Sequence, residues 1–437
     1  MYDWALSSMQ TVVMAAIFPV YFVRVAAADL PGAGGTQLLA RTNAIALGIA
    51  ALLSPVLGAL ADTGAMKKRL LAAFTTVGVA STSALFFVQR GDVALAALLF
   101  GLCMIAGSAS LVFYESLLPH VARPEEMDRV STAGYAIGYL GGGLLASLNL
   151  LWIQKPEWFG LPGAAAEAAA RTLPARLAFL SVGVWWLVFA LPLFLRVREP
   201  PRRLEAGEGA RGNPVRMAFR RLATTLRELR GYRQAFLMLL AFLVYNDGIQ
   251  TIIKMAAAYG AEIGIGTGAL IGAIVMVQFV GIPFSFLFGA IAGRIGTKRS
   301  IFVGLVVYAA ISVLGYHMRT AAHFFLLALL VGMVQGGTQA LSRSLFASLV
   351  PAHKSGEFFG FYGVFEKFAG LFGPLLFDVV IGVTGSSRNA ILSVIGFFAI
   401  GAGILSRVDV DAGRRAAAEA EAAAHEAPPV PEAAAGG

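Results

Sequence analysis

Charged residues and cysteine are scarce in this sequence. Asp, Glu, Lys and Arg together make up 14% of the 437 residues, whereas 58% are hydrophobic. Soluble domains carry about 25% charged residues, so this composition excludes an ordinary soluble protein. The single cysteine, Cys103, excludes a disulfide within the chain and a Cys-rich metal site. Because no metal, phosphate or nucleotide motif is present either, we expect no cofactor, no metal site and no enzyme activity.

The hydrophobic residues lie in long runs. A membrane-spanning helix needs about 20 mainly apolar residues, and runs of this length follow one another along the chain. We therefore predict an all-α integral membrane protein with about twelve transmembrane helices. The predicted spans are residues 4–24, 36–60, 70–90, 93–115, 131–153, 176–197, 234–258, 267–292, 300–317, 321–345, 358–383 and 388–407.

The basic residues are distributed unevenly between the two ends of these spans. A net charge of +9 can indicate nucleic-acid binding, but most Lys and Arg lie in loops on one face and in the tail. Basic loops of this kind are cytoplasmic. We therefore expect both termini in the cytoplasm and a lipid bilayer, not nucleic acid, as the surrounding partner. The first span follows Met1 without a basic leading region, so it is expected to remain in the mature protein.

A polar segment divides the chain into two sets of six spans. Residues 198–233 are rich in Arg and interrupt the apolar pattern. Two six-helix halves joined by a long cytoplasmic loop are typical of transporters built from parallel repeats. We assign residues 1–197 to the first half and 234–407 to the second. Residues 408–437 are rich in Ala, Glu and Pro, and we expect a disordered or partly helical tail.

A short loop pattern follows the second span of each half. Both copies resemble the loop signature of the major facilitator superfamily, in which a Gly-rich turn, an acidic residue and a basic cluster join helices two and three. Glycine allows close helix approach, and the acidic side chain can meet a helix N-terminus across the interface. The alternative is that the basic residues only anchor each loop to its side. The predicted gating residues are Gly58, Asp62, Gly64, Lys67, Lys68 and Arg69 in the first copy and Gly289, Arg294, Gly296, Lys298 and Arg299 in the second, which has Gly293 in place of an Asp.

Polar side chains form one face of the seventh predicted span. Asn246, Gln250 and Lys254 recur every four residues, and Asp247 lies on the same stripe. Ionisable groups within a span cost about 2.5–3.5 kcal/mol each on insertion scales, so they face a cavity or a partner. We predict that these four residues contact substrate in a central cavity and that Asp247 binds a cation or proton. The alternative is that they satisfy one another or a neighbouring helix.

Polar residues of other spans extend the predicted site. Glu366 and Asp378 are candidates for coupling transport to protons, since a carboxylate within the membrane can exchange a proton. Glu366 and its neighbour Lys367 can instead lie at the membrane interface. Arg343 is expected at the cytoplasmic end of the tenth span. The further predicted substrate contacts are Gln10, Gln339 and Tyr362.

Several separate stretches resemble one family. They are Tyr2-Asp3-Trp4-Ala5, Phe18-Pro19-Val20-Tyr21-Phe22, Tyr245-Asn246-Asp247-Gly248 and residues 336–344. In these stretches the chain resembles the autophagy-related vacuolar amino-acid effluxers and their bacterial relatives within the major facilitator superfamily. Leu6 and Glu115 depart from the family pattern, which has Asn at both positions. Glu115 adds a titratable group at the inner end of the fourth span.

The resemblance implies a major facilitator fold in a bacterial inner membrane. It also implies secondary active transport of a small solute by alternating access. Amino-acid efflux and coupling to protons are the finer expectations. Two alternatives stay open, namely a sensor that binds without transport and uses the central loop as its output, and a lipid carrier of the same fold.

Overall fold

The structure is all-helical over the residues that it describes. The computed structural model describes residues 1–31, 34–163, 167, 171–200, 232–262, 265, 267–370 and 372–426, and no strand occurs among them. In this part of the chain, 11 helices are long and apolar enough to cross a membrane. The predicted all-α membrane class is confirmed.

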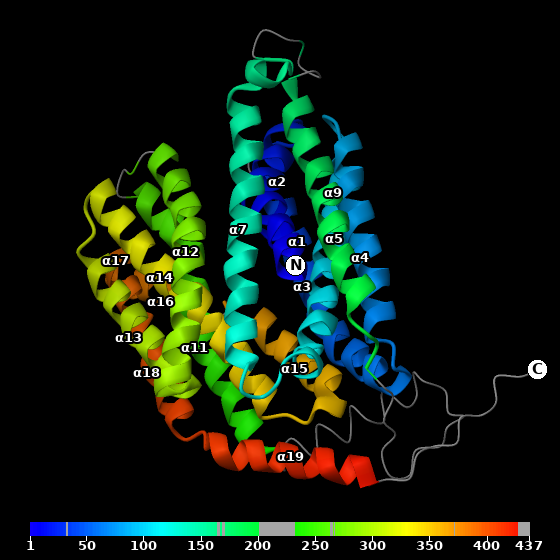
Figure 1. Ribbon diagram of the computed structural model, residues 1–437. Coiled ribbons are helices and arrows are strands. Elements are labelled where there is room, and N and C mark those ends of the chain that lie inside the picture. The colour runs from blue at the N-terminus through cyan, green and yellow to red at the C-terminus, as the bar shows by residue number, and fades with distance from the viewer. Residues whose placement is uncertain are drawn as a thin grey trace, which may run out of the picture.

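The helices that precede the central polar segment form one bundle (Figure 1). Its first span runs from Tyr2 to Ala26 and includes two π-helical stretches. A cluster of buried apolar side chains fills the bundle. Its elements are α1 (Tyr2–Ser8), η1 (Met9–Ile17), α2 (Phe18–Tyr21), η2 (Phe22–Ala26), α3 (Gly34–Gly64), α4 (Lys67–Ala84), η3 (Leu85–Phe87), α5 (Val93–Ser116), α6 (Leu118–Val121), α7 (Met127–Gln154), η4 (Pro156–Phe159) and α9 (Leu173–Arg196).

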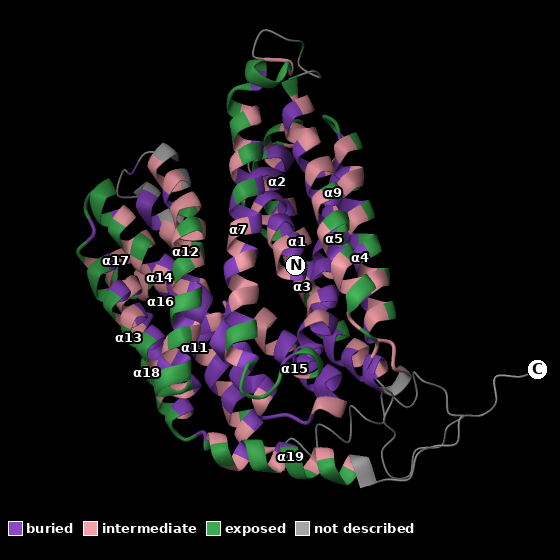
Figure 2. Cartoon of the chain, in the orientation of Figure 1, coloured by how far each residue is buried: buried purple, intermediate pink, exposed green. Residues whose placement is uncertain are grey.

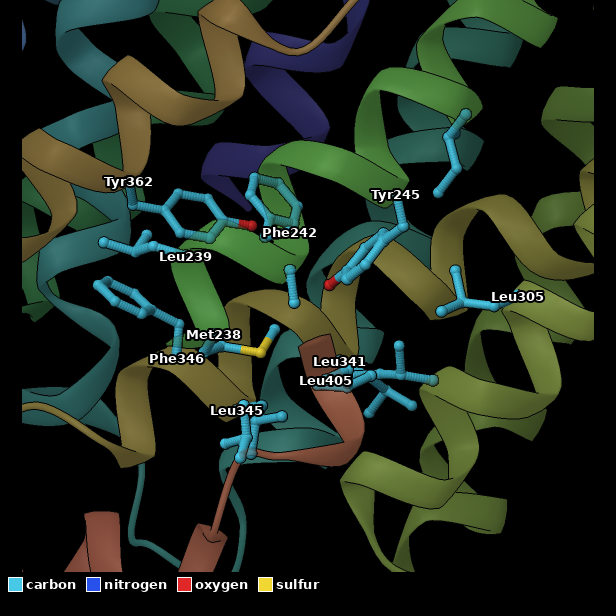
Figure 3. Packing of buried hydrophobic residues seen from close by; sticks show 14 of the residues in the cluster. Met238, Leu239, Phe242, Tyr245, Leu305, Leu341, Leu345, Phe346, Tyr362 and Leu405 are labelled. Carbon is cyan, nitrogen blue, oxygen red and sulfur yellow. The ribbon is translucent and has the colours of Figure 1, made fainter. Parts of the chain in front are cut away.

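The helices that follow form a second bundle with its own apolar core. Figure 3 shows part of this core, where the rings of Phe242 and Tyr362 stack with centroids 4.5 Å apart. The elements are α11 (Arg233–Glu262), α12 (Thr267–Ile295), α13 (Thr297–Tyr316), α14 (Ala321–Ser348), η5 (Ala352–Lys354), α15 (Ser355–Phe368), α16 (Phe372–Thr384), α17 (Ser387–Ser393), α18 (Ile395–Ser406) and α19 (Val410–Glu426). The predicted loop at 198–233 falls mostly on residues 201–231, which lie outside the described residues.

The eleventh predicted span, 358–383, is wrong as a single helix. The chain breaks between α15 and α16, where Gly370 has a φ of +84°. Asp247 stabilises the break from α11, because its carboxylate accepts the backbone N–H groups of Gly370 at 2.7 Å, Phe372 at 3.1 Å and Gly373 at 3.0 Å. A carboxylate at a helix start satisfies N–H groups that have no partner within the helix.

Part of the tail, for which we expect disorder or partial helix, is helical over residues 410–426. Ala, Glu and Arg, which favour helices, form α19 there. The helix lies across the ends of other helices (Figure 1), and its own residue Ala417 is buried. Glu421 contacts His353 Nδ1 at 2.7 Å, which ties α19 to η5.

The two bundles meet mainly at the end of the molecule where α19 lies, called the α19 end below. Here α15 packs along α3, while α7 packs against α12 and α14. Towards the opposite end the bundles separate (Figure 1). Buried residues lie within the bundles and around α15, whereas exposed residues cover the outer faces (Figure 2). Large apolar side chains such as Leu52 and Val306 are exposed there, as expected of a surface that contacts lipid.

Replacing Gly370 tests the break between α15 and α16. Gly370→Ala should lower the free energy of unfolding by about 1–2 kcal/mol, since an L-residue is strained at positive φ. Its added Cβ would also lie 2.7 Å from Lys254 Nζ. Thermal unfolding of the detergent-solubilised protein measures the change. Gly382→Ala on α16 is the control, because nothing lies within 4 Å of its Cβ position. Equal stability of the two variants would contradict the strained break.

Candidate functional site

A cavity of about 580 Å³ lies between the two bundles. The first bundle contributes residues of α1, η1, α5 and α7, and the second contributes residues of α11, α12, α14 and α15. Most of the lining is apolar. The Asp, Glu, Lys and Arg residues that line it are Asp3, Glu115, Arg343, Glu366 and Lys367.

Arg343 on α14 connects the two bundles near the α19 end of this cavity. Its Nε donates to Ser131 Oγ at 2.9 Å, and its Nη2 donates to the Ser131 carbonyl at 3.0 Å. Its Nη1 lies 3.6 Å from Asp3 Oδ1 and 3.9 Å from Glu115 Oε1. The guanidinium also lies over the ring of Tyr135, 4.8 Å from its centroid. Arg343 is therefore near the expected end of its span, but it is buried between the bundles.

Asp3 brings the start of the first span into the same group. Its second carboxylate oxygen accepts a hydrogen bond from the hydroxyl of Tyr114 on α5. The Gly-rich face of α7 makes room for α1, since a Cβ on Gly138 would lie 2.7 Å from Ser7 Oγ. Close packing of small residues in the membrane thus carries Asp3 to Arg343.

Glu366 and Lys367 are adjacent on α15, and both line the cavity. Glu366 Oε2 and Lys367 Nζ form an ion pair at 2.8 Å. The sequence left two positions open for Glu366 and Lys367, the cavity and the membrane interface. In the structure both side chains line the cavity. The helix that carries this pair, α15, packs on α3 and α5 of the first bundle.

Four of the predicted site residues line the cavity. A further polar contact crosses it, where Gln278 on α12 donates to Thr11 on η1 at 2.7 Å. The role of the four predicted residues in binding a solute stays a prediction. The four residues are Gln10, Gln250, Gln339 and Glu366.

The other predicted site residues do not line the cavity among the described side chains. Asp247 faces the α15–α16 break, and Lys254 donates to the carbonyl of Gly370 at 3.2 Å. Asn246 is buried, and its Oδ1 has no hydrogen-bond partner among the residues that the structure describes. Tyr362 lies in the apolar core of the second bundle (Figure 3). The predicted polar face of the seventh span is thus divided between cavity and break, while the side chain of Asp378 lies outside the described part.

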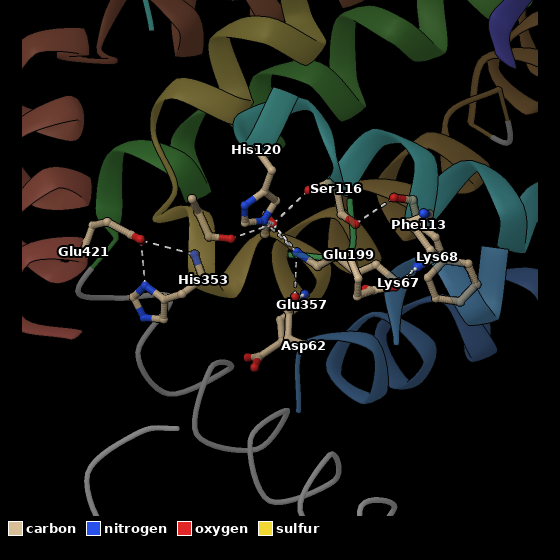
Figure 4. Close-up of polar contacts among 12 residues, drawn as sticks. Asp62, Lys67, Lys68, Phe113, Ser116, His120, Glu199, His353, Glu357 and Glu421 are labelled. Carbon is tan, nitrogen blue, oxygen red and sulfur yellow. Dashed lines mark hydrogen bonds and ion pairs between the residues drawn. The ribbon is translucent and has the colours of Figure 1, made fainter. Parts of the chain in front are cut away.

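The first loop copy contacts the second bundle directly (Figure 4). Asp62 Oδ2 accepts the backbone N–H of Glu357, the third residue of α15, at 2.9 Å. Lys67 pairs with Asp62 Oδ1 at 2.9 Å and donates to Ser355 Oγ at 2.7 Å. Gly58 is in close contact with Gly356, because a Cβ there would overlap the Gly356 carbonyl. Helix-dipole and backbone contacts thus hold α3 against α15.

Two other residues of this loop point away from α15. Lys68 donates its backbone N–H to Glu199 Oε2 at 2.9 Å and its Nζ to the carbonyl of Phe194 at 3.0 Å. Partial burial raises the pKa of Glu199, against the lowering effect of that N–H group. Arg69 is exposed. Gly64 ends α3.

The second loop copy makes a different contact. Asp128, at the start of α7, accepts hydrogen bonds from Thr297 of this loop and from Ser344 on α14, each at 2.5 Å. Lys298 donates to the carbonyls of Ser406 at 2.8 Å and Val408 at 2.7 Å within its own bundle. The remaining predicted residues are the close-packed Gly289, Gly296 with φ +90°, and the exposed Arg294 and Arg299.

Sequence reasoning did not assign Asp3, Asp128 or Arg343 to the site. Asp3 directly precedes the first predicted span, and Asp128 precedes the fifth. Each of these charges is one helical turn or less from the end of an apolar run, where charged residues are common. Their pairing across the bundles carries no local signal, because it depends on which helices become neighbours.

A family model for vacuole effluxers, described as Atg22-like, matches residues 38–418. The chain belongs to this family. It is 38% identical to the uncharacterized MFS-type transporter YxiO of Bacillus subtilis over 409 residues, 93% of each chain. It is also 25% identical to autophagy-related protein 22 of Yarrowia lipolytica over 315 residues, which cover 66% of this chain and about half, 51%, of that protein.

The fold matches a solved member of the major facilitator superfamily. The proton:xylose symporter XylE superposes with a TM-score of 0.69 over 93% of this chain and 94% of its own, at 14% identity. The expected family and the expected major facilitator fold are both confirmed. The chain is thus an integral membrane protein related to transporters of this superfamily.

A larger residue at Gly58 should force the α19 end apart. In Gly58→Leu, the side chain would occupy the space of Gly356, so spin labels at the exposed positions 69 and 299 should move to longer distances. Double electron–electron resonance measures the distance between the two labels in a Cys103→Ser background. Gly48→Leu on the same helix is the control, because nothing lies within 4 Å of its Cβ position. An unchanged distance distribution in Gly58→Leu would contradict a packed closure.

Proposed function

We propose that this protein exports a small zwitterionic solute, in the simplest case an amino acid, by alternating access, and that this transport is coupled to protons. One observation carries the proposal. Side chains of both charges, contributed by both bundles, face one cavity at its α19 end. A solute with a carboxylate and an ammonium group complements such a surface, whereas a purely apolar solute does not.

The bilayer orientation follows from charge. Lys67 and Lys68 lie at the start of α4 and Lys298 at the start of α13, all at the α19 end, so we propose that this end faces the cytoplasm. In this orientation the cavity lies above a closed cytoplasmic side. The contacts of Asp62 and Asp128 are then the ones that must break before the cavity opens inward.

Direction and solute class have separate support. The family model describes vacuole effluxers, which favours export. Gln10, Gln250 and Gln339 supply neutral donors and acceptors along the lining, which suit the polar ends of an amino acid. Their positions on both bundles let the solute bridge the two halves.

Solute counterflow in proteoliposomes tests this function. Labelled amino acids are supplied outside vesicles loaded with the same unlabelled compounds, with and without a proton gradient. Gln339→Ala should slow counterflow about tenfold, the effect of losing one hydrogen bond of about 1.4 kcal/mol. Gln37→Ala, an exposed residue on α3, is the control and should leave the rate unchanged.

Three other results would contradict the proposal. Absence of counterflow for every amino acid would exclude this solute class. Saturable binding without counterflow would indicate a sensor. Movement of labelled phospholipid between leaflets, instead of amino acids across the membrane, would indicate a lipid carrier. Counterflow that does not respond to the proton gradient would remove the coupling alone.

A further inference from the structure

We infer that Glu115, together with Glu366, forms a site for one positive charge at the closed end of the cavity, taken by a proton or by the ammonium group of a solute. The inference deepens the proposed function and rests on it for its role in transport. It moves the cation site away from Asp247, the residue that the sequence favours.

Glu115 is buried, faces the cavity and lacks a hydrogen bond. Its side chain is 4% exposed, and it belongs to the cavity lining. The nearest cation is Arg343, whose Nη1 is 3.9 Å from Oε1, longer than a hydrogen bond. Over the part of the chain that the structure describes, no donor binds its carboxylate. A buried carboxylate in this condition attracts any small cationic donor that reaches it.

Arg343 does not complete the neutralisation of Glu115. Two of its nitrogen atoms are already used by Ser131, at 2.9 Å and 3.0 Å. The third, Nη1, is shared between Glu115 and Asp3, and Asp3 is the nearer of the two at 3.6 Å. One guanidinium thus serves two carboxylates.

The second bundle adds one more carboxylate and its own cation. Glu366 and Lys367 line the same cavity as Glu115, on α15, which packs against α5. Lys367 is itself paired with Glu366 at 2.8 Å. Counted over the lining side chains, the carboxylates of Asp3, Glu115 and Glu366 face the cations of Arg343 and Lys367, which leaves one negative charge without a counterion.

Within the described part of the chain, the elements around Glu115 supply no further cation to the cavity. Tyr135 on α7 lines the cavity, and Tyr114 is hydrogen-bonded to Asp3. Of the lining residues, α3 contributes Leu47 and α4 contributes none. The excess charge is therefore available to a bound cation.

Asp247 is a weaker choice for the same role. Its two carboxylate oxygens accept three backbone N–H groups at the α15–α16 break. Backbone dipoles already stabilise its charge, and it is not among the lining residues. Glu115 differs in both respects.

The site also changes with the state of the transporter. Glu115 lies on α5 in the first bundle, whereas Arg343 and Glu366 lie on the second. When the bundles separate at the α19 end, the distances from Glu115 to both groups must increase. A cation held between Glu115 and Glu366 favours the closed arrangement, so its binding and release are linked to the conformational change.

Charge displacement on a solid-supported membrane tests the site. Proteoliposomes receive either a pH jump without solute or a methylammonium jump at constant pH. Wild type should give a transient current, at least fivefold smaller in Glu115→Gln and in Glu366→Gln. Glu419→Gln, an exposed residue of α19, should match wild type. If Glu115→Gln does not fold, Glu115→Asn replaces it.

Loss of the pH-jump current in Glu115→Gln identifies the proton as the cation, and loss of the methylammonium current identifies the ammonium group. Wild-type currents in both glutamine variants, or no current in wild type, would overturn the inference. Amino-acid counterflow separates the two proposals. If amino-acid counterflow occurs and both glutamine variants keep the wild-type current, only the cation site is overturned. If both variants lose the current and no amino acid shows counterflow, the site is retained and amino-acid transport is rejected.

Discussion

A charge or a free backbone N–H group within the membrane has no water to bind, and this constraint organises the interior of the protein. The α15–α16 break exposes three N–H groups, and Asp247 accepts all three. Arg343 needs several acceptors, and it finds them on α7, α1 and α5. Each polar group is thus stabilised by an element distant in sequence. The positions of helices in the two bundles are tied to these pairings.

The two loop copies differ in the position of the carboxylate, which lies in the loop itself in the first copy and on the facing bundle in the second. In the first copy, Asp62 on the first bundle accepts an N–H group of α15 on the second. The second copy has Gly293 in place of that Asp, and the carboxylate comes from Asp128 on the opposite bundle. Each interface therefore retains one carboxylate near the start of a helix. The departure at Gly293 is compensated by the partner surface, not by the loop itself.

The apolar runs predicted most of the spans, because the cost of a charge in lipid acts locally and appears directly in the sequence. The repeat of the Gly58 loop predicted a close contact, and Gly58 indeed meets Gly356. The eleventh span was predicted as continuous because its residues are apolar throughout. Neither Gly370 nor Pro374 reveals by itself that an acceptor on α11 will stabilise a break.

By itself the sequence determined the membrane class, the approximate spans and the family, since hydropathy, charge distribution and short motifs are properties of neighbouring residues. Only the tertiary structure decided which polar groups face the cavity. The stripe from Asn246 to Lys254 is real, but helix rotation and the α15–α16 break turn Asp247 away from the cavity and leave Gln250 within it. Glu115 lies near the end of a helix, and only the packing of α14 and α15 brings Arg343 to 3.9 Å from it and Glu366 into the same cavity. Electrostatic pairing acts through space, and the neighbours that create it are set by packing.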